Sequence, residues 1–202
     1  MFPVMSSART LLQLVGADRS PSKLRDACLI LIDLQNEYIA GPIALPDAEA
    51  ATASAARLLA AARRLETPII HVAHLGAPGS LFDRAADRGA IIVGVAPIGG
   101  ETVIEKRLPN AFAGTELKAR IEATGRKDIV LAGFMTHMCV SSTARAALDF
   151  GFRTTVDAAS CATRDLPDGR GGTISAATVH RVALAELADR FAVIAADSEA
   201  LF

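Results

Sequence analysis

Residues 128–151 of the chain have the sequence DIVLAGFMTHMCVSSTARAALDFG. The first six residues, Asp128–Gly133, form a short apolar run of the kind that predicts a buried strand. Cys139–Phe150 has the longer, alanine-rich pattern of a helix, and Gly151 follows it, as glycine commonly follows a helix C-terminus. The stretch therefore predicts a strand, a turn and a helix, with a cysteine where the helix begins.

The same alternation of apolar runs and helical segments continues in both directions. Ala27–Asp33 is apolar up to its last residue, which favours a strand buried on both faces. Further strands are predicted at Pro68–His74, Thr102–Lys106, Arg153–Asp157 and Phe191–Ala195. Helices are predicted from Asp47 to about Glu66, at Thr115–Thr124 and at Thr173–Arg190, with a short helix near 81–88 and an apolar turn at 90–95. Strands separated by helices indicate βαβ units, so we expect one α/β domain with three layers (α/β/α) and a mostly parallel, Rossmann-like sheet of about six strands.

Composition narrows the class of protein. The chain has 202 residues and a formal net charge of −1, which suits one domain and gives no electrostatic footprint for nucleic acid or an anionic membrane. We expect residues 1–25 to form an arm outside a domain that spans 26–202. The three cysteines are widely spaced and suggest no disulfide framework, and no secretory or membrane-spanning segment is evident. A cytoplasmic location is the resulting expectation.

Chemically active residue types close three of the predicted strands. Asp33 and Lys106 end two of them, and Cys139 follows a third. The carboxyl ends of parallel strands meet at one edge of the sheet, where ligands bind. A cysteine at a helix N-terminus is expected to have a lowered pKa, and a nearby carboxylate can accept its proton. The alternative for a lone cysteine is a small buried hydrophobic residue.

At these residues the sequence resembles the isochorismatase-like cysteine hydrolases, a family related to nicotinamidase and N-carbamoylsarcosine amidase. The resemblance covers about residues 25–195 and keeps the family's order of motifs. It is carried by Asp33-Leu34-Gln35-Asn36, by Lys106 followed by Asn110-Ala111-Phe112, and by Gly133-Phe134-Met135-Thr136-His137-Met138-Cys139-Val140 with its continuation to Gly151. The resemblance implies a parallel six-stranded sheet between helices, in agreement with the strand pattern.

The resemblance also implies roles for individual residues. Asp33 would be the general base and acid, Lys106 the third member of a triad, and Cys139 the nucleophile. The peptide between Phe134 and Met135 would be cis, and the amides of Met135 and Cys139 would form an oxyanion hole. The implied reaction forms a thioester on Cys139, releases ammonia or an amine, and ends with hydrolysis by water. It requires no cofactor.

Four residues are candidates for binding the substrate. Gln35 and Phe112 match pocket-lining positions of the family, and the alternative for Phe112 is ordinary core packing. His137 could contact the substrate or hydrogen-bond the turn before Cys139, and Tyr38 could cap the pocket or pack under the 39–46 loop. Cys161 is expected to be structural, with an approach to the site left open, and residues 168–172 are expected to form a mobile turn.

Departures from the family pattern narrow the activity. Nicotinamidases carry an Asp-x-His motif and a further histidine for a metal, whereas no histidine follows Asp33 closely here. His71 and His74 are three apart on a predicted strand, so they should point to opposite faces, and no metal site is expected. Enzymes that hydrolyse isochorismate typically lack the cysteine, so Cys139 favours cleavage of a C–N bond in a small amide, carbamoyl or ureido compound. Two alternatives stay open: isochorismatase-type vinyl-ether hydrolysis, and a non-catalytic protein that binds a small ligand or a partner.

The expected partners are a small-molecule substrate and further copies of the chain. Family members are often dimers or tetramers, which the resemblance extends to this protein. The arm carries Leu11, Leu12, Leu14 and Val15, which could reach a neighbouring subunit.

Overall fold

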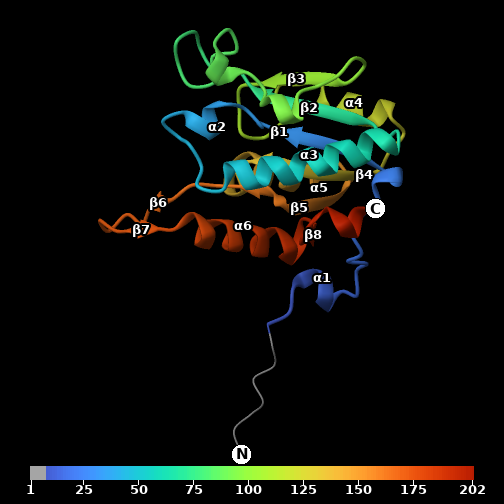
Figure 1. The fold of residues 1–202 in the computed structure, drawn as a ribbon. Coiled ribbons are helices and arrows are strands. Elements are labelled where there is room, and N and C mark those ends of the chain that lie inside the picture. The colour runs from blue at the N-terminus through green and yellow to red at the C-terminus, as the bar shows by residue number, and fades with distance from the viewer. Residues whose placement is uncertain (1–7) are drawn as a thin grey trace, which may run out of the picture.

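A computed structural model describes residues 8–202 of the protein (Figure 1). Its centre is a six-stranded sheet in which every neighbouring pair is parallel, in the order β3-β2-β1-β4-β5-β8. The strands are β1 (Ala27–Ile32), β2 (Ile69–His74), β3 (Thr102–Lys106), β4 (Asp128–Phe134), β5 (Arg153–Ala162) and β8 (Val193–Ala195). The predicted α/β fold is confirmed.

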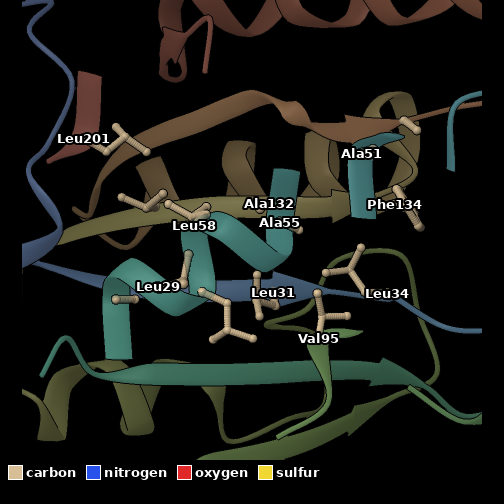
Figure 2. Close-up of a cluster of buried hydrophobic side chains, with 14 of the residues drawn as sticks. Leu29, Leu31, Leu34, Ala51, Ala55, Leu58, Val95, Ala132, Phe134 and Leu201 are labelled. Atoms are coloured by element: carbon tan, nitrogen blue, oxygen red, sulfur yellow. The ribbon is translucent and has the colours of Figure 1, made fainter. Parts of the chain in front are cut away.

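Helices cover both faces of this sheet. α3 (Ala48–Arg64) lies on one face, while α4 (Leu117–Ala123), α5 (Ser141–Asp149) and α6 (Ala176–Arg190) lie on the other. Side chains alternate along β1, so that Leu29 and Leu31 pack under α3 and Ile30 packs on the opposite side. Figure 2 shows the α3 side, where Ala55 and Leu58 lie over β1 and β4. Each large aliphatic side chain buried in this way stabilises the fold by about 1.5–3 kcal/mol.

Two short helices lie outside these layers. α1 (Leu11–Leu14) lies beside α6, where the amide of Leu11 donates to Oδ1 of Asp189 at 2.8 Å. α2 (Glu37–Ala40) follows β1. Neither helix was predicted, because four residues are too few to show helical periodicity. The boundary between an arm at 1–25 and a domain at 26–202 stays a prediction.

The region between β2 and β3 differs from its prediction. No α-helix forms near 81–88; the chain makes turns and two 3₁₀ turns, Asp87–Gly89 and Val93–Val95. The carboxylate of Asp83 accepts hydrogen bonds from the amides of Gly79 and Ala85. Such local side-chain bonds offer the backbone an alternative to helical pairing. The predicted helix is therefore wrong.

Two further boundaries were also wrong. β5 extends to Ala162 rather than ending at Asp157, because its pairing with β4 shifts at a bulge between Leu131 and Gly133. α6 begins at Ala176 with Ser175 as its N-cap, so Thr173 does not start the helix. Instead β7 (Thr173–Ile174) pairs with β6 (Leu166–Pro167), and residues 168–172 form the turn of this hairpin.

The carboxyl ends of the parallel strands define one edge of the molecule. Figure 1 shows α2, the loop after β2 and the β6–β7 hairpin on the side to which the strands point. Within residues 8–202, no helix is both long and apolar enough to cross a membrane.

Candidate active site

Asp33 occupies the first position after β1. Its φ angle is 52°, a left-handed conformation that aspartate tolerates better than most residues. The turn is fixed by two backbone hydrogen bonds, from the Asp33 amide to the Val72 carbonyl and from the Gln35 amide to the Asp33 carbonyl, each at 2.8 Å. The carboxylate is fully buried at the carboxyl edge of the sheet.

Lys106, the last residue of β3, brings a buried ammonium group to the same point. Its Nζ lies 2.6 Å from Oδ2 of Asp33 and 3.3 Å from Sγ of Cys139. This close contact joins two side chains that are both fully buried. A buried charge is tolerated when it is paired, so the lysine and the aspartate stabilise each other's charged form. We call Asp33, Lys106 and Cys139 the buried trio.

Cys139 lies in a π-helical turn, Thr136–Val140, and the regular helix α5 begins only at Ser141. Burial is the main influence on this thiol: together with the negative charge of Asp33, it raises the pKa of Cys139 to about 12, although Lys106 opposes the shift. The expectation of a lowered pKa is therefore wrong. The partial charge of a helix end is small, and here it is outweighed by the loss of hydration and by the nearby carboxylate.

The pKa of Asp33 is also displaced. Burial raises it, whereas the contacts with Lys106 and Cys139 lower it, and the net direction is upward. A thiol and a carboxyl group that are both raised in pKa and in mutual contact form a pair that holds one transferable proton. The arrangement suits proton transfer between sulfur and oxygen during a reaction.

The turn that precedes Cys139 has the shape predicted for it. The peptide bond between Phe134 and Met135 is cis, as the resemblance implied. The Met135 carbonyl accepts hydrogen bonds from the amides of Met138 and Val140, which closes the turn. The Met135 amide itself donates to no backbone carbonyl in the described part of the chain. This N–H group is one of the two that the resemblance assigns to an oxyanion hole.

Comparison with known proteins identifies the family. The Isochorismatase domain model matches residues 27–199. The chain belongs to the isochorismatase family. A secreted isochorismatase effector, Isc1, from Verticillium dahliae is 36% identical over 96% of this chain and 99% of its own length. The crystal structure of an isochorismatase from Pseudomonas putida KT2440 has a TM-score of 0.92 at 45% identity and covers 96% of this chain and 100% of that one.

A third relative is named for the hydrolysis of an amide. The maleamate amidohydrolase of Pseudomonas putida is 33% identical over 71% of this chain and 73% of its own. The protein is accordingly a hydrolase of the isochorismatase family, and its family includes enzymes that act on C–N bonds. Because one relative is named as secreted, the cytoplasmic location stays a prediction.

The substrate-binding candidates are not brought together. The Gln35 side chain is buried and used within the fold: its Nε2 donates to the carbonyls of His74 and Gly89, and its Oε1 accepts from the His74 amide. Phe112 packs against Phe150 and Phe152, with ring centroids 5.1 and 6.1 Å away. Phe150 lies eleven residues after Cys139, roughly 16 Å at the helical rise, so Phe112 contacts the far end of α5.

Tyr38 and His137 lie closer to the carboxyl edge. Tyr38 is buried between the rings of Phe82 and Phe134, at 5.1 and 5.5 Å. Burial, followed by the negative charge of Asp33, raises the pKa of Tyr38, so its hydroxyl stays protonated. The Nδ1 atom of His137 lies 2.5 Å from Oγ1 of Thr163, which anchors the turn before Cys139 to the residue after β5.

Two residues at this edge were missed by sequence reasoning. The imidazole of His74, at the end of β2, has its Nδ1 3.3 Å from Nζ of Lys106. Arg164 follows β5, and burial, followed by the positive charge of Arg164, lowers the pKa of His137. Both follow from the rule that identified the buried trio, because each stands where a parallel strand ends. The sequence suggested His74 only as a metal ligand, and the predicted end of β5 fell five residues too early for Arg164 to follow it.

The remaining chemistry of the edge is limited. Cys161 pairs with Gly133 in the sheet and belongs to the same apolar cluster as Cys139, and burial raises its pKa to about 12. Among residues 8–202, no three His, Cys, Asp or Glu side chains are grouped so as to hold a metal ion. A cavity of about 510 Å³ lies at α2, lined by Asn36, Ile39, Ala40, Gly41, Pro42, Asp87 and Arg88, none of them a member of the buried trio.

Proposed function

We propose that this isochorismatase-family hydrolase cleaves the C–N bond of a small amide, carbamoyl or ureido compound through a thioester on Cys139. The observation that carries the proposal is the position of Lys106, whose Nζ is 2.6 Å from a carboxylate oxygen of Asp33 and 3.3 Å from the sulfur of Cys139. The three groups needed to move a proton and form a nucleophile are thus in one buried contact.

The first half of the reaction uses the shared proton. Asp33 accepts the thiol proton as the Cys139 sulfur attacks the carbonyl carbon, and Lys106 offsets the negative charge that remains. The oxyanion is held by the amides of Met135 and Cys139. The C–N bond then breaks as Asp33 returns its proton to the leaving nitrogen, which departs as ammonia or an amine.

The second half regenerates the enzyme. Asp33 removes a proton from water, which attacks the thioester carbon, and collapse of the second tetrahedral intermediate releases the carboxylic acid. The sulfur leaves as a thiolate and recovers its proton from Asp33. Overall, one amide bond and one water molecule are consumed, and one carboxylic acid and one molecule of ammonia or amine are formed. The reaction uses no external cofactor.

The sulfur of Cys139 favours C–N bond cleavage over vinyl-ether hydrolysis. Protonation of a vinyl ether, as in isochorismate hydrolysis, needs the acid Asp33 but no thiol. A raised thiol pKa beside a carboxylate fits an attacking group that is deprotonated during the reaction. A binding protein would gain nothing from a buried acid, amine and thiol in contact, since such groups are costly to bury.

The test is a panel of small primary amides, carbamoyl and ureido compounds together with isochorismate, assayed with the wild-type protein and with Cys139→Ala. We expect ammonia release by the wild type, a fall of at least about a thousandfold in the variant, and an acyl adduct on the Cys139 peptide in quenched samples. Cys28→Ala is the matched control, because Cys28 is equally buried with a pKa also raised to about 12. Turnover of isochorismate that survives Cys139→Ala would contradict the proposal.

A further inference from the structure

Lys106 carries a buried ammonium group, and such a group has three N–H donors and no acceptor. Two of its neighbours belong to the buried trio: the Asp33 carboxylate at 2.6 Å and the Cys139 sulfur at 3.3 Å. The third neighbour is Nδ1 of His74, also at 3.3 Å. The number of acceptors therefore equals the number of donors. If one acceptor were lost, the ammonium could rotate, and neither remaining contact would be fixed.

His74 is held in place through both its backbone and its ring. Its amide donates to Oε1 of Gln35 at 2.8 Å, and its carbonyl accepts from Nε2 of Gln35 at 3.0 Å. The ring of Phe82 lies against the imidazole, with centroids 5.0 Å apart. The side-chain amide of Gln35 also donates to the Gly89 carbonyl, so Gln35, two residues after Asp33, ties β1, β2 and the loop that carries Phe82 together. This gives the buried Gln35 side chain a use that does not involve the substrate.

We propose that His74 is a positioning residue of this hydrolase, whose Nδ1 lone pair accepts one N–H of the Lys106 ammonium and thereby directs the other two at Asp33 and Cys139. This inference rests on the proposed function of the buried trio and assigns it a fourth member. His74 touches neither the sulfur nor the reacting carbon; it acts through Lys106.

The arrangement requires a neutral imidazole with its proton on Nε2. Burial lowers the pKa of His74, and the positive charges of Lys106 and of Arg107 lower it further, while Asp33 opposes them. These charged groups come from β3, from the residue after it and from the turn after β1; Phe82 contributes only its ring. A protonated His74 would lose the acceptor and set a second cation beside Lys106, so positioning should fail in acid.

Two variants distinguish the loss of the hydrogen-bond acceptor at Nδ1 from the loss of ring packing against Phe82. His74→Phe keeps a ring against Phe82 but removes the acceptor, whereas His74→Asn places an amide oxygen near the position of Nδ1. With a substrate found by the panel, we expect kcat to fall about 10- to 100-fold in His74→Phe, the effect of losing one hydrogen bond to a charged group, with KM unchanged. His74→Asn should stay within about threefold of the wild type, because its amide oxygen still accepts from the ammonium.

The pH dependence of the reaction would not change if His74 only packed against Phe82, so it tests the positioning role. Below the pKa values of His74 and of the Asp33–Cys139 pair, the wild-type plot of log kcat/KM against pH should approach a slope of two, one for each proton. His74→Asn should show a slope of one. Equal losses in the two variants, or slopes that do not differ, would overturn the proposal.

Two further measurements test the role of His74 without a substrate, and the first of them needs no variant. In ¹⁵N-histidine NMR spectra of the wild-type protein at neutral pH, Nδ1 of His74 should be the unprotonated nitrogen; a proton on Nδ1 would refute the assignment. Alkylation of Cys139 by iodoacetamide, followed by peptide mass spectrometry, should be slower in His74→Phe than in His74→Asn. If alkylation behaves in this way while no amide is hydrolysed, the proposed substrate class fails and the role of His74 stands. If amides are hydrolysed but the two variants are alkylated at the same rate, the proposed function stands and the role of His74 fails.

Discussion

At the scale of single residues, the protonation state of Cys139 determines how the proposed reaction must begin. A thiol whose pKa is raised to about 12 by burial and by Asp33 is protonated at neutral pH. In the proposed reaction, the nucleophile is therefore not a preformed thiolate but forms when Asp33 accepts the proton. Asp33 is placed for this role because it contacts the thiol and its charge is balanced by Lys106.

The raised pKa predicts the pH dependence of alkylation in the absence of substrate. Because only the thiolate reacts, the rate constant for iodoacetamide at Cys139 should rise about tenfold per pH unit from pH 7 to 10. An unperturbed thiol would level off above about 8.5. The measurement is the alkylated fraction of the Cys139 peptide over time at each pH.

Asp33→Asn sharpens this prediction, because it removes the negative charge that raises the thiol pKa and leaves Lys106 in place. Alkylation at pH 8 should become faster, while hydrolysis should fall by at least about a hundredfold for want of a proton acceptor. A plateau near pH 8.5 in the wild type would show that burial does not raise the pKa of this thiol, and slower alkylation in Asp33→Asn would show that the charge of Asp33 does not.

Sequence patterns identified the residues whose place follows from strand ends and motifs, and missed those whose place follows from packing. Asp33, Lys106 and Cys139 each stand at or beyond the end of a strand, and the structure brings them together. The orientation of Phe112 toward the far end of α5 depends on aromatic partners forty residues away in the chain, which no local pattern shows. The thiol pKa also escaped prediction, because burial is a property of the folded structure.

At the scale of elements, the turn from β4 to α5 depends on the close approach of two strands. Gly133 has a φ angle of 126°, and a Cβ atom at this position would lie 2.0 Å from the Ile32 carbonyl oxygen. Because that atom is backbone, it has little freedom to move. Gly133 pairs with Ile32 in the sheet and precedes the cis peptide, so the spacing of β1 and β4 there sets where Asp33 and Cys139 meet.

Gly133→Ala should therefore damage both stability and activity. We expect a loss of roughly 3 kcal/mol or more from backbone strain and overpacking, or about 6–12 °C in Tm for a chain of this size. Calorimetry or circular dichroism would measure it. Gly151→Ala is the matched control: its φ of 79° is also positive, but nothing lies within 4 Å of the added Cβ, so only the cost of the conformation, about 1 kcal/mol, should appear. Equal losses in the two variants would remove the argument from close approach.

The elements that sequence patterns predicted poorly are those held by side-chain bonds rather than by periodicity. β5 was expected to end at Asp157. The structure buries that carboxylate, where it accepts a hydrogen bond from Ser160 at 2.6 Å across the bulge, and the strand resumes. The turns at 76–100 are likewise fixed by Asp83 and by the ion pair between Glu37 and Arg88, whose contacts are 2.6 Å long. The long, periodic elements α3, β1 and β4 were predicted to within about two residues.

At the scale of the whole molecule, helices cover both faces of the sheet. Charged contacts join one of these helices, α3, to the β2–β3 side of the sheet. Glu101, just before β3, accepts from Arg63 of α3 at 2.7 Å, from the Ile98 amide at 3.0 Å, and lies 2.9 Å from Nε2 of His71 in β2. Burial opposes the ionised form, but the bonds from Arg63, Ile98 and His71 prevail and lower the pKa of Glu101 to about 2. This cluster joins α3 to the β2–β3 side of the sheet.

The cluster predicts how the stability of the protein depends on pH. A carboxyl group with a lowered folded pKa stabilises the native state above its unfolded pKa, here about 4.5, and that stability is lost as the pH falls toward 2. His71 acts in the same direction: burial lowers its pKa, so acid protonates the unfolded chain first.

Glu101→Gln should cost roughly 2 kcal/mol of stability at pH 7, or about 4–8 °C in Tm, and should flatten the fall of Tm between pH 4.5 and 2.5. Glu122→Gln, which removes an exposed pair with Lys118 at 3.7 Å, should leave the curve unchanged. Thermal melts across that pH range decide the matter: if wild type and Glu101→Gln lose stability in parallel on acidification, the acid lability originates elsewhere in the molecule.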